Sequence, residues 1–310
     1  MSSAVEAIRA HAARATPGTV LTGLVGAGIG PSLSPPLHEA EARRLGLELG
    51  YARFDLDDLG VPATAVGPMV AAARDAGYRG LNITHPCKQV VLEHLDELSP
   101  DAAALAAVNT VVFRDGRAVG HNTDWSGFAR GLRTGLPGVD LGSVVLLGAG
   151  GAGAAVAHGL LTAGAGRVRV FDLDAGRAGE LAAALAGRFG PGRASAGADL
   201  AADVGAADGL VHATPTGMAA HPGLPLPAAL LRPGLWVAEV VYRPLETELV
   251  RTARALGARV LDGGRMAVFQ AVEAFRLFTG TEPDAGRMLR HLGELTATPP
   301  PERQPADVLD

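Results

Sequence analysis

The stretch VVLLGAGGAG at residues 144–153 is the strongest structural signal in this chain of 310 residues. Its four apolar residues are typical of a buried strand, and they run directly into a turn with G-x-G-x-x-G spacing that precedes an alanine-rich segment of helical character. In that context the glycines permit a tight turn, the close approach of a pyrophosphate to a helix N-terminus, and close packing of helix on strand. The stretch therefore predicts a Rossmann-type dinucleotide site made of Gly148, Gly150, Gly151, Ala152 and Gly153.

The next apolar segment, residues 168–171, predicts a second strand, which ends in Asp172. An acidic residue at this point, 22 residues after Gly150, accepts hydrogen bonds from the adenosine ribose and repels a 2′-phosphate. Asp172 therefore favours NAD over NADP as the cofactor. The alternative is that Asp172 only caps the helix predicted over 175–186, although Asp174 could fill that role instead.

Short apolar segments alternate with segments of helical spacing along most of the chain. Such alternation is typical of parallel sheets covered by helices, and a chain of this length exceeds what one hydrophobic core usually holds, so we expect two domains. The segments after residue 261 predict only helices, and residues 1–18 and 296–310 are expected to be flexible. The other predicted strands are 20–25, 51–56, 81–84, 108–113, 209–213, 235–241 and 259–261, and the predicted helices include 36–45, 66–76, 88–95, 125–133, 152–163, 247–256, 266–278 and 283–295.

Composition narrows the class of protein. A net charge of −5 argues against nucleic-acid binding. No apolar run reaches the ~18 residues of a membrane span, and the first residues lack the apolar core of a signal peptide, so we expect a soluble, cytoplasmic protein that binds no membrane. The single Cys87 permits no intrachain disulfide, and the nine histidines have no spacing typical of a metal site, so we expect no metal.

The rarest residue types gather in one place. Lys88 is the only lysine beside 26 arginines, and Asn82 and Ile83 belong to types that occur three times each. All three types have AT-rich codons, so a GC-rich coding bias leaves them where their chemistry is needed. Residues 81–88, LNITHPCK, predict a strand that ends at a proline before a helix, which brings Asn82, Thr84 and Lys88 to a sheet edge where α/β proteins bind ligands.

Lys88 is therefore a candidate acid–base residue, because a lysine, unlike an arginine, can exchange a proton when its surroundings lower its pKa. Downstream, the stretch GHNTD at 120–124 supplies Asp124, which could pair with Lys88. A solvated lysine on a helix, and turn and helix-capping roles for Asn122, Thr123 and Asp124, are the alternatives that the residues themselves leave open.

Taken in order, the motifs resemble those of the shikimate dehydrogenase family over residues 20–290. They are Ser32-x-Ser34, Asn82-x-Thr84-x-Pro86-x-Lys88, AVNT at 107–110, GHNTD at 120–124, the glycine turn, HATPTGM at 212–218, and Gly263-x-x-Met266-x-x-x-Gln270. The resemblance implies an N-terminal α/β substrate-binding domain over 19–123 plus 263–295, a Rossmann-type NAD-binding domain over 124–262, and C-terminal helices that return to the first domain. It also implies reversible hydride transfer between the C3 carbinol of shikimate, or its equivalent in quinate, and nicotinamide.

The resemblance also assigns roles to single residues. Lys88 would transfer the proton and Asp124 would be its partner. The substrate contacts would be Ser32, Ser34, Thr84, Asn109, Tyr242 and Gln270. Asp172 and Arg177 would lie near the adenosine, and the nicotinamide would lie among Thr214, Pro215, Met218, Val240 and Gly263. The substrate is a small molecule, no metal is required, and a homodimer is left open.

One departure from the family's majority concerns the cofactor. NADP-using members follow the second strand with an Asn-Arg-Thr-like turn whose arginine receives the 2′-phosphate, whereas this chain has Asp172-Leu173-Asp174, as the NAD-dependent quinate/shikimate branch does. Quinate-using members often change the second serine, and Ser34 is retained here, so we expect shikimate, with quinate as a second substrate. The alternatives are an aminoshikimate or aminoquinate dehydrogenase, a Rossmann dehydrogenase of the methylene-tetrahydrofolate type, and a non-catalytic NAD-binding regulatory protein.

Overall fold

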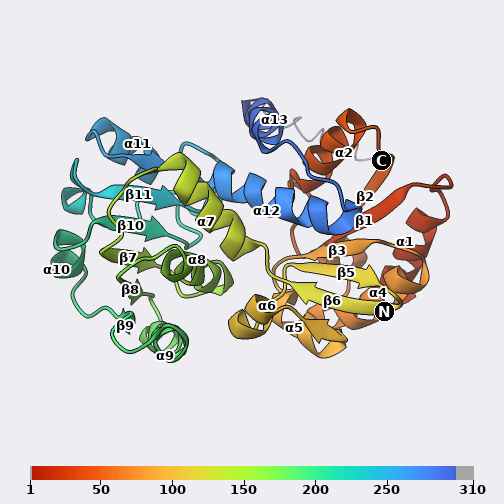
Figure 1. Ribbon diagram of the computed structural model, residues 1–310, viewed down its shortest axis with the longest axis horizontal. Helices are drawn as coiled ribbons and strands as arrows, with labels where there is room; N and C mark the ends of the chain where they lie inside the picture. The colour runs from red at the N-terminus through yellow and green to blue at the C-terminus, as the bar shows by residue number, and fades with distance from the viewer. Residues whose placement is uncertain (1, 298–310) are drawn as a thin grey trace, which may run out of the picture.

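Two lobes, each built on a six-stranded sheet, make up the computed structural model, which describes residues 2–297 (Figure 1). The strands of the N-terminal sheet come from residues 20–121 and those of the C-terminal sheet from residues 143–261. This mixed α/β architecture agrees with the fold class expected from the sequence.

The C-terminal sheet is parallel throughout. Its order is β9-β8-β7-β10-β11-β12, the 3-2-1-4-5-6 order of the doubly wound dinucleotide-binding fold. Alternate residues of its central strand β7 face opposite layers: Val144 and Leu146 pack in one buried cluster, Val145 and Leu147 in another. The strands are β7 (Ser143–Leu147), β8 (Arg167–Phe171), β9 (Ala194–Ala196), β10 (Gly209–His212), β11 (Trp236–Glu239) and β12 (Val260–Leu261).

The N-terminal sheet is mixed, which corrects the expectation of parallel sheets. Its order is β2-β1-β3-β5-β6-β4, and β5 is antiparallel to both of its neighbours. The cause is a two-residue turn between β5 and β6, where Asp115 and Gly116 both have positive φ, as a tight hairpin requires. The strands are β1 (Val20–Gly26), β2 (Leu49–Asp55), β3 (Gly80–Ile83), β4 (Glu97–Leu98), β5 (Thr110–Arg114) and β6 (Arg117–His121).

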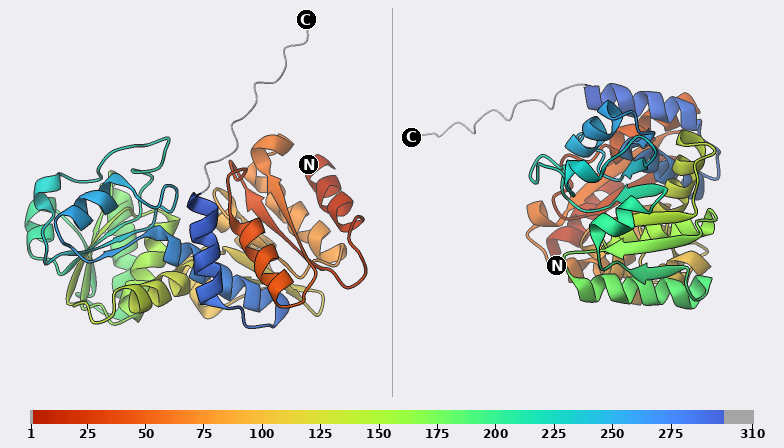
Figure 2. Two further views of the ribbon diagram at one scale, coloured as in Figure 1. Left: turned by 90° about the horizontal axis from the view of Figure 1, so that it is seen from above. Right: turned by 90° about the vertical axis from the view of Figure 1, so that its left-hand side faces the viewer.

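Two long helices, α7 and α12, connect the lobes (Figures 1 and 2). They pack against one another, and α12 also contacts β1, β5 and α2, so the C-terminal helices return to the first lobe as expected. Among the described residues none forms a helix long and apolar enough to cross a membrane. The α-helices are α1 (Ser2–Ala12), α2 (Ser34–Arg44), α3 (Leu56–Leu59), α4 (Val66–Asp75), α5 (Cys87–Val90), α6 (Pro100–Leu105), α7 (Asp124–Gly135), α8 (Gly151–Thr162), α9 (Ala175–Phe189), α10 (Leu200–Gly205), α11 (Glu248–Ala255), α12 (Gly263–Thr279) and α13 (Ala285–Ala297), and the 3-10 helices are η1 (Ala63–Ala65), η2 (Val91–His94) and η3 (Ala228–Leu230).

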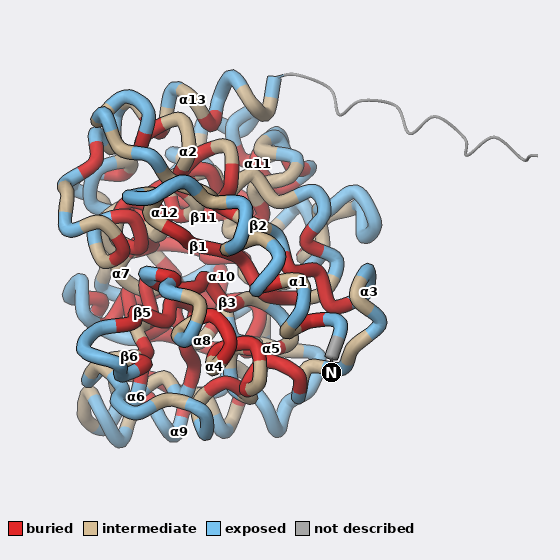
Figure 3. Tube along the Cα trace, turned by 90° about the vertical axis from the view of Figure 1, so that its right-hand side faces the viewer, coloured by how far each residue is buried: buried red, intermediate tan, exposed pale blue. Residues whose placement is uncertain are grey.

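The beginning of the chain is folded, which corrects the expectation that residues 1–18 are flexible. Helix α1 packs on α4, and its Ala4 and Ile8, four residues apart on one helix face, are fully buried in the core of the first lobe (Figure 3). A short alanine-rich helix gains stability mainly from such docking, which its own sequence does not reveal. The expectation of a flexible segment at 296–310 falls outside the described residues, apart from Thr296 and Ala297, which end α13.

Candidate active site

Lys88 and Asp124 form an ion pair where the two lobes meet. Lys88 lies on α5, just after β3, and Asp124 is the first residue of α7. The Lys88 Nζ donates to Asp124 Oδ2 at 2.6 Å, with 24% of the lysine side chain and 12% of the aspartate side chain exposed. The pair is thus accessible to a small molecule and yet partly withdrawn from water, as proton transfer requires.

A buried hydrogen-bond network holds the carboxylate of Asp124. Asn109 donates from Nδ2 to Asp124 Oδ1 at 2.9 Å and accepts the Thr123 N–H at Oδ1 at 2.7 Å. Behind Asn109, the Thr110 hydroxyl accepts from Asn82 Nδ2 at 3.0 Å and donates to Asn109 Oδ1 at 3.1 Å. Asn109 therefore fixes one carboxylate oxygen of Asp124, Oδ1, and the other oxygen, Oδ2, points toward Lys88.

Asn82 and Asn122 anchor the two ends of this network. The Tyr51 hydroxyl donates to Asn82 Oδ1 at 2.6 Å. Asn122 donates to the Ala107 carbonyl at 3.0 Å and accepts the Asp124 N–H at 3.1 Å. All three asparagines of the chain are buried, with at most 6% exposure. Amides that both donate and accept suit such positions, which arginine or alanine could not satisfy.

The loop that carries Ser32 and Ser34 is held by charged residues of β2. Asp55 accepts three backbone N–H groups at 2.7 to 3.1 Å, those of Gly28, Ile29 and Gly30. Arg53 donates to the Ser32 carbonyl at 2.8 Å, and Arg243 of the other lobe donates to the Pro31 carbonyl. Ser34 begins α2, so the loop and helix present the two serines together.

Tyr51 contacts Ser34, and Tyr242 lies close enough to Tyr51 to influence its pKa. Burial raises the pKa of the Tyr51 hydroxyl far above its ordinary value, and the Ser34 hydroxyl and the Arg53 guanidinium oppose that effect. Burial likewise raises the pKa of Tyr242, against the effect of Arg243. Both phenols are therefore neutral hydrogen-bonding groups. Ser34 also donates its N–H to the Ser32 hydroxyl oxygen at 3.3 Å, so the two serines are neighbours, and Tyr51 lies between Ser34 and Tyr242 in this series of contacts.

Thr84 and Gln270 occupy different positions relative to the ion pair. Thr84 ends the β3 segment and packs against β1, since a side-chain carbon on Gly26 would lie 2.3 Å from its methyl group. Gln270 donates to the Ala267 carbonyl of its own helix at 2.8 Å, while its backbone packs on Gly127 of α7. Within the described part of the chain, residues 2–297, Gln270 has no hydrogen bond to Lys88 or Asp124.

The glycine turn between β7 and α8 has the geometry of a dinucleotide site. Gly148 has φ +107°, and a side-chain carbon on Gly153 would lie 1.9 Å from the Gly148 carbonyl oxygen, so both positions need glycine. Gly150 is the N-cap of α8. Apart from chain neighbours and the backbone of α8 itself, no atom of residues 2–297 lies within 4 Å of the place where a side-chain carbon of Gly150 or Gly151 would be. Open space before a helix N-terminus with free N–H groups fits a pyrophosphate.

Asp172 follows β8 directly beside this turn. Its carboxylate accepts the Ala149 N–H at 2.7 Å and the Asp174 N–H at 2.9 Å. Burial works against ionisation of Asp172, but these two bonds and the charge of Arg177 outweigh it, so the pKa of Asp172 is lowered. The helix cap is Asp174, which accepts the Arg177 N–H, and the guanidinium of Arg177 lies 3.7 Å from the same carboxylate.

The residues expected around the nicotinamide converge on the other side of the turn. A side-chain carbon on Gly148 would lie 3.0 Å from the Thr214 methyl group, and one on Gly263 would lie 2.6 Å from the Val240 carbonyl. Pro215, which follows Thr214 in the chain, is exposed, and Met218 is 43% exposed. Strands β7 and β10 are neighbours, and the strand order reverses between them, which is where ligands bind in this fold.

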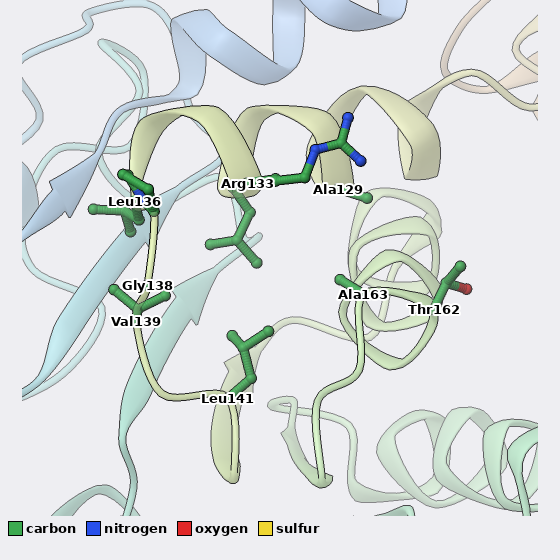
Figure 4. A pocket seen from close by; sticks show the side chains of 10 residues that line it. Ala129, Arg133, Leu136, Gly138, Val139, Leu141, Thr162 and Ala163 are labelled. Carbon is green, nitrogen blue, oxygen red and sulfur yellow. The ribbon is translucent and has the colours of Figure 1, made fainter.

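A separate cavity of about 430 Å³ lies between the C-terminal ends of α7 and α8 (Figure 4). Its lining is mostly apolar, with Leu132, Leu136 and Val139 among its residues and Arg133 as its charged member. Asp124 begins α7, whereas the lining residues of this helix start at Ala129, about 8 Å further along the helix axis. The cavity is therefore distinct from the site of Lys88.

Several supporting residues were not predicted. Tyr51, Thr110, Asp55 and Arg53 act through contacts between segments distant in sequence. Two signals in the sequence pointed toward two of them: Thr110 belongs to the AVNT motif at 107–110, and Asp55 is a polar residue near the end of the predicted strand 51–56.

Comparison with known proteins agrees with this geometry. Residues 24–111 match the family model for the shikimate dehydrogenase substrate binding domain, and residues 264–292 match that for the shikimate 5′-dehydrogenase C-terminal domain. A shikimate dehydrogenase (NADP(+)) of Streptomyces avermitilis is 66% identical over 285 residues, which cover 91% of this chain and 98% of the relative. The chain belongs to the shikimate dehydrogenase family.

Other members of the family differ in the cofactor they are named for. A quinate/shikimate dehydrogenase (NAD(+)) of Corynebacterium efficiens is 50% identical over 275 residues, covering 87% of this chain and 96% of the relative. The structure of quinate dehydrogenase from Corynebacterium glutamicum in complex with NAD matches with a TM-score of 0.84 and 46% identity, over 89% of this chain and 99% of that one. The chain is accordingly an oxidoreductase of the shikimate/quinate dehydrogenase type that uses a nicotinamide dinucleotide.

Proposed function

We propose that the protein is an NAD-dependent shikimate dehydrogenase, which reversibly oxidises shikimate to 3-dehydroshikimate and also accepts quinate. The observation that carries the proposal is the ion pair of Lys88 and Asp124, which the buried amide of Asn109 holds. It occurs in a chain whose C-terminal lobe has a glycine turn shaped for a dinucleotide. A non-catalytic regulatory protein would have no need to keep a partly exposed lysine and carboxylate 2.6 Å apart.

In the proposed reaction the protein moves a proton and the cofactor moves a hydride. A nicotinamide dinucleotide held by the glycine turn would supply the acceptor for the hydride of the carbinol carbon. Lys88 takes the hydroxyl proton in oxidation and returns it in reduction, with Asp124 as its partner. Asn109 keeps the carboxylate turned toward Lys88, because its amide donates to the other carboxylate oxygen.

The substrate carboxylate would lie against Ser32 and Ser34, with Tyr242 beside them. Neutral hydroxyl donors suit a carboxylate, and the neighbouring Arg53 and Arg243 add positive charge nearby. Thr84 and Gln270 would contact the ring hydroxyls. An aminoshikimate or aminoquinate dehydrogenase remains the second candidate, since the same contacts would hold an amine-bearing ring.

The preference for NAD rests on the turn after β8. Asp172 and Asp174 place two carboxylates there, and Arg177, the cation of this turn, lies against Asp174. The 2′-phosphate of NADP would be repelled by the carboxylates of Asp172 and Asp174, and Arg177 already pairs with Asp174, so this turn disfavours NADP. Relatives of both preferences exist, as the NADP(+) name of the Streptomyces protein shows.

The test is a matrix of turnover assays that follow the absorbance of reduced nicotinamide. Shikimate, quinate and aminoshikimate would each be combined with NAD and with NADP. We expect the highest kcat/KM for shikimate with NAD and a measurable value for quinate. No turnover in any combination would remove the catalytic proposal, and a higher kcat/KM with NADP would remove the cofactor assignment alone.

A further inference from the structure

A buried glutamate and histidine lie beneath the loop that follows β10. His212 ends β10 and Glu239 ends β11, and the two are partners in the parallel register. Neither side chain is exposed to solvent, at 0% each. His212 Nδ1 lies 2.8 Å from Glu239 Oε1, and His212 Nε2 lies 2.5 Å from Oγ1 of Thr214. Burying such groups is costly, and the proposed proton transfer uses neither of them, so their presence calls for another role.

Three groups contact the carboxylate of Glu239. The Val241 N–H donates to Oε1 at 3.0 Å and the Thr247 hydroxyl donates to Oε2 at 2.9 Å, in addition to the contact with His212. A carboxylate has only acceptors, so Nδ1 of His212 carries the hydrogen of this contact. When the ring is neutral, Nε2 is then the acceptor and the Thr214 hydroxyl donates to it.

This arrangement fixes the orientation of the Thr214 hydroxyl and of its loop. In addition to its hydrogen bond with His212, the Thr214 hydroxyl oxygen accepts the Thr216 N–H at 3.3 Å. The loop also rests on the same group, because a side-chain carbon on Gly217, with φ +96°, would lie 3.2 Å from Thr247. Val241, two residues after the end of β11, donates its N–H to Glu239 Oε1, the same carboxylate oxygen that His212 contacts.

We propose that Glu239 and His212 are positioning residues for the nicotinamide half of the dinucleotide and act through Thr214. The inference rests on the proposed function and on the family resemblance, by which the nicotinamide would lie among residues that include Thr214, Val240 and Gly263. The carboxylate of Glu239 contacts both segments: the loop after β10 through His212 and Thr214, and the backbone after β11 through the Val241 N–H. Any shift of Glu239 would therefore move both sides of that place together, while the glycine turn that would hold the pyrophosphate lies on β7 and would stay.

Equilibrium binding of NAD and of ADP-ribose, which is NAD without its nicotinamide, separates this role from a purely structural one. Thr214→Val and Glu239→Gln keep the side-chain size but remove the hydroxyl and the charge. We expect each to weaken NAD binding about 5- to 10-fold, the scale of one lost hydrogen bond, with ADP-ribose binding changed less than about twofold. Thr214→Ser should restore NAD binding. Thr134→Val, on the exposed face of α7, is the matched control and should change neither affinity.

Equal weakening of NAD and ADP-ribose, or no weakening of either, would overturn the inference, since the pair would then serve only the fold. Should Glu239→Gln not fold, the comparison of Thr214→Val with Thr214→Ser decides. If the wild-type protein binds NADP more tightly than NAD, the same comparison is made with NADP in place of NAD and 2′-phospho-ADP-ribose in place of ADP-ribose. The measurement is independent of turnover, so a wild-type protein that binds NAD but oxidises neither shikimate nor quinate would remove the proposed function and leave this inference standing.

Discussion

Replacing Lys88 tests the proposed chemistry most directly, because two substitutions separate its charge from its proton. Lys88→Ala removes both, whereas Lys88→Arg keeps a positive charge beside Asp124 that does not dissociate near neutral pH. Positioned acid–base groups contribute about 10²- to 10⁴-fold to turnover. We therefore expect kcat of Lys88→Ala to fall about 10³-fold, equivalent to about 4 kcal/mol in the barrier, and Lys88→Arg to fall nearly as far.

The structural cost of the same changes is much smaller. Lys88 is 24% exposed, so water can replace its ammonium, and Asp124 keeps the hydrogen bond from Asn109 at 2.9 Å. The loss of one partly exposed charged hydrogen bond in Lys88→Ala costs about 1–2 kcal/mol of unfolding free energy. Lys88→Arg should recover most of that stability because its guanidinium can still donate to Asp124.

Three measurements make the distinction. Absorbance of reduced nicotinamide gives kcat at saturating shikimate, dinucleotide fluorescence gives cofactor affinity, and urea unfolding gives stability. Gln89→Ala, next to Lys88 on α5 and exposed, is the matched control and should match the wild type in all three. Turnover by Lys88→Arg within about tenfold of the wild type would refute proton transfer by Lys88, since loss of a proton-transfer group costs at least about 10²-fold.

Three further predictions concern the cofactor site and the core. Asp172→Ala removes one negative charge from the turn after β8, so the NAD/NADP ratio of kcat/KM should fall about tenfold; an unaltered ratio would contradict the assignment of Asp172. Gly150→Ala should fold normally but bind the dinucleotide about tenfold more weakly because its methyl enters open space, whereas Gly153→Ala, whose methyl meets the Gly148 carbonyl, should lose about 2 kcal/mol or more of stability in urea unfolding; the reverse pattern would contradict the geometry of the turn. His38 is fully buried, and that burial lowers its pKa to about 3; below pH 6.5 the unfolded chain gains a proton that the folded state refuses, so stability falls by roughly 2–3 kcal/mol between pH 6 and pH 4, and His38→Leu should remove that part of the acid sensitivity in urea titrations at the two pH values.

The sequence alone determined the features that depend on local chemistry. The turn at 144–153 could be predicted because only glycine accepts φ +107° at position 148 or the 1.9 Å approach at position 153. Most strands and helices of the C-terminal lobe followed from apolar periodicity for the same local reason, whereas β9 and α10 were not predicted. The scarcity of lysine and asparagine pointed to Lys88, Asn82, Asn109 and Asn122, because amide and ammonium groups have no substitute among the residues that the coding bias favours.

Tertiary structure alone decided what depends on contacts between distant segments. The antiparallel strands β5 and β6, the docking of α1 through Ile8, and the 2.6 Å approach of Lys88 to Asp124 each join segments that local patterns describe only one at a time. The buried pair of His212 and Glu239 is the clearest case. Each residue ends its own strand, and only the parallel register of β10 and β11 makes them neighbours. A pattern along one strand records which face a side chain takes, whereas the partner across the sheet is set by the packing of the whole lobe.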